Sequence, residues 1–410
     1  MRQQFKLLNL IVLLSLFSIN SIRANKWEDE TQERCFAQFT LITPIGSNGF
    51  KSSATTNNLS FNLLYGVSGG VHGFELGGLH NTTNGDMNGF QLAGLGNVTT
   101  GITKGVQFGG LYNVDINLTT GVQIAGITNV IKGPSKGAHF AGITNFVSNE
   151  SWAFQAGGIA NITPGGNHGF QLAGITNVNG KDGEGSQIAG LINVNYGKTS
   201  KFQLAGLINV STNGTHGIQI AGIANYTKRL HGFQLGLINV ADTLEKGVPL
   251  GLISIVKHGY YAFEIEANDA FWVNATYKMG VPKLYNIFTV GFKKQDNNEM
   301  WGVGLGLGSL VPIGKNWGLN FDLTATHINE NEWCTEELNL LNRLKINAWY
   351  DLGKIKLYGG PSLNVHVSNL KNEEGQPGGN LIDPDMSFYH ETHGETRTVV
   401  YPGFNLGIRF

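Results

Sequence analysis

The chain of 410 residues contains little charge and little cysteine. Lys, Arg, Asp and Glu together make up 14% of the residues, and the formal net charge is −1. No run of Lys or Arg forms the basic stripe with which proteins bind nucleic acid, so we expect no nucleic-acid partner. The only cysteines are Cys35 and Cys334. A disulfide between them is chemically allowed in an exported protein, but their spacing does not show whether the two thiols meet, and two unrelated thiols are the alternative.

Long apolar runs are also missing after residue 24. No later segment has the roughly 18 apolar residues that a membrane-spanning helix needs, so any insertion into a membrane must use strands. Residues 1–24 have the composition of a secretory signal peptide. Arg2 and Lys6 form a basic start, Leu7 to Phe17 is a short apolar run, and Ala24 is a small residue at a suitable cleavage point. The sequence therefore predicts an exported protein.

Glycine is abundant, with 58 residues, and a repeat between residues 73 and 258 explains most of the excess. The unit reads Gly, an aromatic or aliphatic residue, Gln, Leu or Ile, Ala, Gly, Leu or Ile, any residue, Asn and Val. Its second glycine recurs every 16 residues from Gly78 to Gly222, and two further copies, from Gly232 and Gly247, are one residue short. Such a fixed period is the mark of stacked repeats. The asparagine recurs in the same register at Asn81, Asn97, Asn113, Asn129, Asn145, Asn161, Asn177, Asn193, Asn209 and Asn225.

Each unit is predicted to form one coil of a β-solenoid. Apolar residues alternate within the unit, as at Phe90 and Leu92, which is the period of a strand. The alternation breaks at Ala93–Gly94, and this change predicts a corner, because strand side chains otherwise point to opposite faces in strict order. A second corner is expected at or just after Asn97. About twelve coils would stack with equivalent residues about 4.8 Å apart.

Side chains at equivalent positions are expected to form columns along the solenoid. We expect Leu and Ile columns to fill the core and the asparagines to form an amide ladder between coils. The glutamines of the unit would form a second ladder. The alternative, a transmembrane hairpin in each unit, is rejected because a strand that crosses a membrane needs about 9–11 residues.

The segment 25–72, before the array, contains two strand-like stretches, Phe36 to Thr43 and Leu59 to Tyr65. A turn signal from Pro44 to Gly49 separates them. The two stretches would either cover the open N-terminal end of the solenoid, which a stacked repeat needs, or contribute strands to the C-terminal domain. We favour the cover.

The segment 259–410 has a different pattern, with eight alternating stretches. Trp301, Val303, Leu305 and Leu307, for example, face one way while glycines face the other. Alternation of apolar and polar residues over about 10 positions, with short connections on one side and long loops on the other, is typical of an outer-membrane β-barrel. A soluble antiparallel sandwich is the alternative. The stretches are approximately 260–267, 270–279, 286–294, 300–310, 317–327, 343–351, 355–367 and 400–410.

The end of the last stretch places four apolar residues on one face and closes the chain on phenylalanine. This arrangement resembles the C-terminal signature of bacterial outer-membrane barrel proteins, which the insertion machinery reads. The residues are Phe404, Leu406, Ile408 and Phe410.

The sequence contains no catalytic motif in a suitable context. A nucleophile elbow, a phosphate loop and a dinucleotide fingerprint are all missing, and we predict no catalytic, cofactor-binding or metal-binding residue. A hydrolase would need His327, His366 and Ser362 to meet, but nothing in the sequence ties them together. His139, His168, His216 and His231 fall at unit boundaries and are not expected to share a column.

The richest polar cluster lies in the last long loop. Its histidines and carboxylates would suit a divalent metal, although such a run is more often a solvated loop. The cluster consists of Asp383, Asp385, His390, Glu391, His393 and Glu395.

The units Gly89–Val98 and Lys201–Val210 resemble those of a family of bacterial surface-repeat proteins, as do the stretches Thr43–Gly49 and Asn58–Leu64. The resemblance covers most of the mature chain. It implies an exported protein of the outer membrane or cell surface, with no established activity and no functional residues to carry over.

We therefore expect a non-enzymatic protein in which a small barrel, in contact with outer-membrane lipid, anchors a solenoid. The solenoid would serve as a scaffold or as an interaction surface for an unidentified protein or glycan. One alternative is a secreted solenoid that binds glycans, although its tyrosines at 112, 196 and 226 do not repeat. The other, a hydrolase borne on the barrel, is disfavoured.

Overall fold

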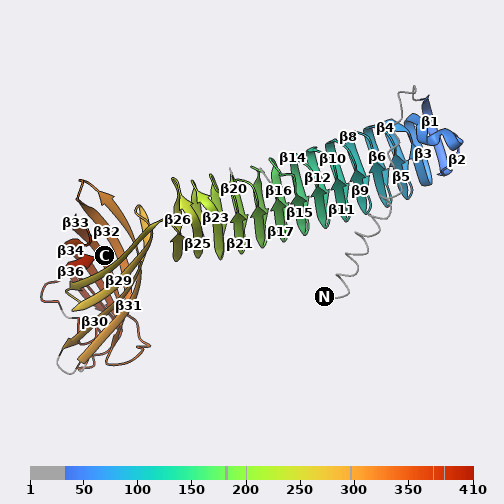
Figure 1. The fold of residues 1–410 in the computed structure, drawn as a ribbon. Helices are drawn as coiled ribbons and strands as arrows, with labels where there is room; N and C mark the ends of the chain where they lie inside the picture. Colours follow the sequence, from blue (N-terminus) through green and yellow to red (C-terminus); the bar gives the residue numbers. More distant parts are fainter. Residues whose placement is uncertain (1–32, 181–182, 200, 296–297, 373, 383) are drawn as a thin grey trace.

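The computed structural model describes residues 33–410 except 181–182, 200, 296–297, 373 and 383. The predicted signal peptide, residues 1–24, lies outside the described residues. The chain forms a long rod of parallel strands followed by an antiparallel sheet of nine strands (Figure 1). None of the helices in the described part of the chain is long and apolar enough to span a membrane.

The rod is a parallel β-solenoid of about 12 turns, as predicted. Each coil contributes two strands, and each strand pairs with its equivalent in the next coil, for example Gln91 with Gln107 and Asn97 with Asn113. The first strands of the coils are β4 (Gly70–Gly77), β6 (Met87–Ala93), β8 (Thr103–Gly109), β10 (Thr119–Ala125), β12 (Ser135–Ala141), β14 (Ser151–Gly157), β16 (Phe170–Ala173), β18 (Ser186–Ala189), β20 (Phe202–Ala205), β22 (Ile218–Ala221), β24 (Phe233–Leu235) and β26 (Val248–Leu250). The second strands are β5 (His80–Thr83), β7 (Gly96–Thr99), β9 (Tyr112–Asp115), β11 (Thr128–Ile131), β13 (Thr144–Val147), β15 (Ala160–Thr163), β17 (Thr176–Asn179), β19 (Ile192–Asn195), β21 (Ile208–Ser211), β23 (Ala224–Leu230), β25 (Ile238–Leu244) and β27 (Ile253–Val256).

The predicted corner at the Ala-Gly pair is confirmed. β6 ends at Ala93 and β7 begins at Gly96. The glycine at this corner is required by the close approach of the neighbouring coil. A Cβ atom at Gly142 would lie 2.1 Å from the carbonyl oxygen of Gly126, and real Cβ atoms do not come this close to oxygen.

Short elements before the array cover the N-terminal end of the rod. They are β1 (Glu33–Ile42), β2 (Ile45–Gly46), the 3₁₀ helix η1 (Gly49–Ala54) and β3 (Thr55–Ser68). β1 pairs in parallel with β3, and β3 pairs with β4 and β5 of the first coil. These strands therefore extend the solenoid and do not join the antiparallel sheet.

The interior of the rod is polar, so the prediction of a Leu and Ile core is wrong. Gln107 and Asn113 are fully buried, whereas Leu92 and Leu111 are 36% and 41% exposed. Glutamine, alanine and asparagine share the inward-facing positions of the coil, and the larger aliphatic residues take the outward ones. The amides can lie inside because most of them bond to a copy in a neighbouring coil, which offsets the usual cost of burying a polar group.

The antiparallel sheet contains all eight predicted strands. They are β28 (Tyr260–Asn268), β29 (Val273–Val281), β30 (Leu284–Gln295), β31 (Asn298–Pro312), β32 (Trp317–Glu330), β33 (Asn339–Asp351), β34 (Lys356–Ser368) and β36 (Thr396–Arg409). A ninth strand, β35 (Tyr389–His393), forms a hairpin with β36 inside the long last loop. β36 pairs with β34 and also with β28, where Ile408 lies opposite Ile265. The two ends of the eight-strand series are therefore paired with each other.

The last coil of the rod contacts the connection between β29 and β30. Asn286 accepts a hydrogen bond from the backbone nitrogen of Ser254 at 2.9 Å and donates one to the carbonyl oxygen of Gly251 at 2.7 Å. Val256 of the rod and Val281 of the sheet are buried in one cluster. The other short connections, 313–316 and 352–355, lie at the same end of the strands. In Figure 1 the rod runs across the direction of β31 and does not continue it.

Candidate functional site

The inward face of the antiparallel sheet carries a network of opposite charges, beside a buried apolar cluster that includes Phe271 and Met300. Lys278 lies between two carboxylates, with its Nζ 2.7 Å from Asp322 and 3.0 Å from Glu264, and all three side chains are fully buried. Arg409 binds the same Glu264, and the hydroxyl of Tyr285 donates to Asp322 at 2.6 Å. Every charge in this part of the network meets an opposite one, as burial of charges requires.

The network continues along the sheet with a second pair of acids. Lys345 binds Glu266 at 2.9 Å, and Arg343 binds Asp269 at 2.8 Å. The hydroxyl of Tyr358 donates to Glu266 at 3.2 Å. Four acids are thus matched by four bases across the two parts. This arrangement holds the strands together from inside.

The residues that a hydrolase would need are not brought together. The Nε2 atom of His366 lies 2.7 Å from Asn339, and that of His327 lies 3.1 Å from the carbonyl oxygen of Thr335. Ser362 accepts a bond from Arg343 at 3.5 Å. Each candidate has a different partner, so the geometry gives no nucleophile and base in contact among them.

The asparagine column forms the predicted ladder. Each of the ten asparagines is buried and donates through Nδ2 to the Oδ1 atom of the next, at 2.8 to 3.0 Å. The ladder extends to Asn62 before the array and to Asn239 after it. The same Nδ2 atom also donates to a carbonyl oxygen at the corner of the next coil, as Asn145 does to Ala156 at 2.9 Å.

The glutamine column forms a second ladder, in which Glu75, His139 and Pro249 stand in place of glutamine. Gln107 donates to Gln91 at 2.8 Å, and later coils repeat this contact. Glu75 accepts the amide of Gln91 at the start of the ladder, and burial raises the pKa of its carboxyl group. Asp115, in a neighbouring column, contacts two glutamines.

His139 interrupts the glutamine ladder. It takes the place of a glutamine between Gln123 and Gln155. Both of its ring nitrogens are buried without a hydrogen-bond partner, and burial lowers the pKa of the ring to about 4. The histidine is therefore neutral near pH 7, and its two ring nitrogens remain unpaired in the core.

The four residues of the C-terminal signature share one face of β36, as predicted. Phe404, Leu406 and Phe410 are about 60% exposed, and Ile408 is 38% exposed. They belong to the outward, apolar face of the sheet. Whether an insertion machinery reads them stays a prediction.

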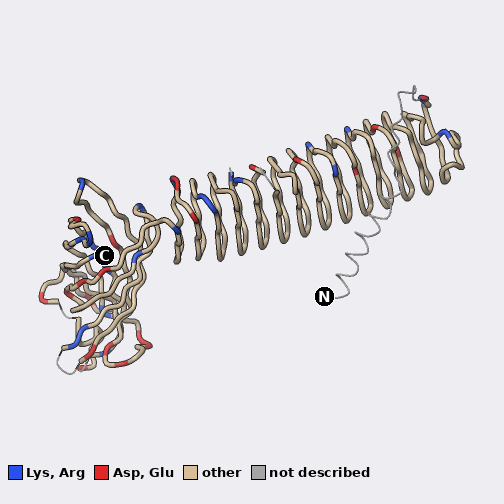
Figure 2. Tube along the Cα trace, in the orientation of Figure 1, with Lys and Arg blue, Asp and Glu red and all other residues tan. Residues whose placement is uncertain are grey.

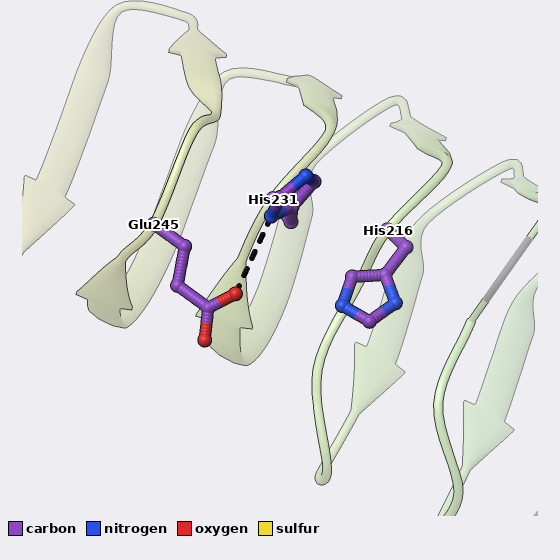
Figure 3. Close-up of side chains that lie close together, drawn as sticks. All are labelled: His216, His231 and Glu245. Atoms are coloured by element: carbon purple, nitrogen blue, oxygen red, sulfur yellow. Dashed lines mark hydrogen bonds and ion pairs between the residues drawn. The ribbon is translucent and has the colours of Figure 1, made fainter.

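Three side chains from successive coils converge on one edge of the rod (Figure 3). The rings of His216 and His231 meet edge to face with centroids 5.1 Å apart, and Nδ1 of His231 lies 3.3 Å from a carboxylate oxygen of Glu245. One potential ligand atom from each residue lies within 4.8 Å of the others. His216 and Glu245 are exposed and His231 is half-buried.

The prediction that these histidines do not share a column is wrong. The coil after His216 is one residue short, which brings His231 level with His216; the preceding residues, Thr215 and Leu230, form a bridge. Leu230 pairs in turn with Leu244, so Glu245 follows in the same column. Counting residues in fixed units of 16 hid this alignment, and aligning the shortened units would have found it.

The two cysteines and the polar cluster of the last loop do not form sites. Cys35, in the N-terminal cover, and Cys334, in the loop after β32, are both free. In the loop, His390 accepts a bond from Arg397 at 3.1 Å, and Asp383 lies outside the described residues. Among the described part of the chain, the His216, His231 and Glu245 group alone has the convergence that a metal ion needs.

Comparison with known proteins gives no further identification. A scan against protein-family models found no match, and searches of curated proteins and of solved structures found none either.

Proposed function

We propose that the protein is a non-enzymatic repeat protein of a bacterial outer membrane or cell surface. The antiparallel sheet closes into an eight-stranded barrel through β28 and β36, spans the membrane and anchors the solenoid, which acts as a scaffold or an interaction surface. The predicted signal peptide would export the chain to this location.

One observation carries the proposal: the inward face of the sheet carries a buried charge network beside one apolar cluster around Phe271, while its outward face is apolar. The inward face holds the matched charges around Lys278 and Glu266, while outward residues such as Val290, Leu305 and Leu323 are 52%, 44% and 57% exposed. A soluble sandwich has the opposite arrangement, because its apolar faces pack on each other. Barrels in outer membranes have this apolar belt, and eight strands leave room for side chains inside but not for a pore.

Heat-modifiability of the protein in a membrane fraction tests this proposal. We expect unboiled protein to migrate differently from boiled protein on a denaturing gel, because a folded membrane barrel resists detergent until it is heated. The protein should also stay with the membrane after a carbonate wash. Absence of the shift, together with release into the soluble fraction, would contradict the barrel and favour a secreted solenoid.

A further inference from the structure

The rod has a charge-free edge, which contains the Ala-Gly corners of all the coils. In each coil, this edge and its two flanking strands run from the residue before the glutamine position to the residue after the asparagine position. In one coil these are residues 154–162. Across all coils, Glu75 is the only Lys, Arg, Asp or Glu in these stretches, and its side chain points inside. Figure 2 shows charges along one edge of the rod and none along the other.

Large apolar side chains cover this charge-free edge without interruption. The column that follows the corner glycine has ten members that are 37 to 55% exposed: Leu79, Leu95, Leu111, Ile159, Ile175, Leu191, Leu207, Ile223, Leu237 and Leu252. A shallow furrow beside this column, bounded by Ile124, Phe140 and Leu172, is lined by apolar side chains and glycine. Soluble monomers rarely expose an apolar patch beyond a few hundred Å², and this one runs the length of the rod.

The backbone nitrogens at the charge-free edge are paired with the preceding coil. At one corner, the nitrogen of Gly158 donates to Ala141, and those of Ile159 and Ala160 both donate to Ile143, at 2.9 to 3.1 Å. The carbonyl oxygen of Ala156 is bound by the side chain of Asn145. The asparagine ladder thus seals each corner. Hydrocarbon requires backbone polar groups to be paired within the protein, and these corner nitrogens are paired in this way.

The apolar surface of the rod continues onto the outward face of the sheet. Leu252 and Ile255 on the last coil are 50% and 36% exposed, and Tyr261 and Tyr277 on the adjoining strands are 39% and 42% exposed. The rod meets the sheet at the end with the short connections and runs across its strands (Figure 1). A membrane around the sheet would therefore meet the side of the rod.

From these observations we propose that the charge-free edge of the solenoid is inserted into lipid. The rod lies along the membrane, in the leaflet on the side of the short connections, with its charged edge facing water. The inference rests on the proposed membrane-spanning barrel. Lipid fits this surface better than a second copy of the chain, because the edge has no charged side chain on its surface to set a register and is continuous with the apolar belt of the sheet.

Site-directed fluorescence quenching in vesicles tests this inference. The full-length protein, with Cys35 and Cys334 changed to serine, receives one labelled cysteine and is inserted into dioleoylphosphatidylcholine vesicles with or without bromine on the acyl chains. Ile175→Cys reports on the charge-free edge, Glu150→Cys on the charged edge, and Val290→Cys on the outward face of the sheet. All three positions are exposed, so the variants should fold, and heat-modifiability checks each one.

We expect bromolipid to quench the label at position 175 about as strongly as that at 290, and iodide in the water to quench only the label at 150. Quenching at 290 but not at 175 would overturn the inference and leave the proposed function standing. If the label at 175 is then shielded from both quenchers and copies cross-link through it, the edge binds a second copy. If bromolipid does not quench the label at position 290, the proposal of a membrane-spanning barrel is wrong.

A second inference follows independently from the column of His216, His231 and Glu245. The geometry points to a divalent transition-metal site of the zinc type on the charged edge. Two imidazoles and one carboxylate are ligands that zinc prefers, with a water molecule completing the tetrahedron. Small rotations of these side chains, of which His231 is half-buried and the other two exposed, would shorten the separations of up to 4.8 Å between ligand atoms to those around one ion.

Zinc titration of the full-length protein by calorimetry tests this site. We expect the affinity for Zn²⁺ to fall roughly tenfold or more in His231→Ala. Removing a residue that only supports a metal ligand already lowers affinity by about this factor, and His231 would bind the ion directly. His168→Ala is the matched control, because His168 stacks on Trp152 along the same rod, with centroids 5.1 Å apart. An unchanged affinity in His231→Ala, or an equal loss in the control, would overturn the assignment.

Discussion

Replacing Asp115 by asparagine should stabilise the protein in a way that depends on pH. Asp115 is fully buried in the rod. Its carboxyl group accepts hydrogen bonds from Thr119 at 2.7 Å, Gln123 at 2.9 Å and Gln107 at 3.2 Å. These donors are neutral, so they do not cancel the cost of burying a negative charge. Burial raises the pKa of the carboxyl group from 3.8 to about 6, against the opposing effect of the hydrogen bonds.

The sign of the pH dependence follows from this pKa. Between about pH 4 and pH 6 the folded chain holds a proton that the unfolded chain has lost, so the free energy of unfolding falls as pH rises through this window. Above pH 6 the loss is complete and amounts to about 3 kcal/mol for roughly two pKa units. Asparagine cannot ionise, and the equivalent positions in two later coils already hold Asn179 and Asn195.

Urea unfolding of the full-length protein in detergent micelles, followed by far-ultraviolet circular dichroism, measures this difference. Asp115→Asn should gain about 2–3 kcal/mol over the parent between pH 4 and pH 8. Any constant effect of the new amide cancels in this comparison. A difference that does not change with pH, or that shrinks as pH rises, would show that the three donors hold the carboxylate more strongly than burial penalises it.

Three further predictions concern the ladders and the charge network. Asn161→Ala leaves donors and acceptors of two adjoining coils unpaired in the core and should lower the free energy of unfolding by about 2–4 kcal/mol, measured by the same urea titration. Lys278→Met leaves Asp322 buried without its cation and should cost about 3–5 kcal/mol, seen as a lower temperature of gel-mobility conversion; Lys294→Met, from a half-exposed ion pair, should cost less than about 1 kcal/mol. His139→Gln restores the glutamine ladder, and its stabilising effect should grow as pH falls from 6.5 towards 4. Over this range the unfolded chain binds a proton at the histidine, whereas the buried ring in the folded chain does not. A constant effect in urea titrations across this range would contradict the burial argument.

Much of the architecture could be predicted from residue periods alone. A repeat of 16 residues predicted the coil, its Ala-Gly corner and the register in which Asn97 lies beside Asn113. The asparagine ladder followed, because identical residues at one position of a parallel stack must neighbour each other. Strand alternation also located all eight long strands of the antiparallel sheet, although it missed the short β35 in the last loop.

The side of the coil that faces inwards could not be predicted in this way. Alternation separates Gln91 from Leu92 but does not say which of them is buried. The usual rule places leucine inside, but here stacking gives most inward amides a partner in a neighbouring coil and leaves the main aliphatic columns outside. The candidate metal site was missed for another reason, because a fixed count of 16 residues puts His231 out of register with His216, whereas the shortened coil brings them level.

The periodicity of the chain thus specified which residues are neighbours along the rod, since a fixed repeat length leaves one register. The tertiary structure decided what each neighbour faces. The pairing of β28 with β36 and the contact of Asn286 with the last coil join segments whose meeting no local pattern encodes. These long-range contacts place the charge-free edge of the solenoid beside the apolar face of the sheet. The sequence could not predict them, because contacts between distant segments depend on the whole fold and not on any one period.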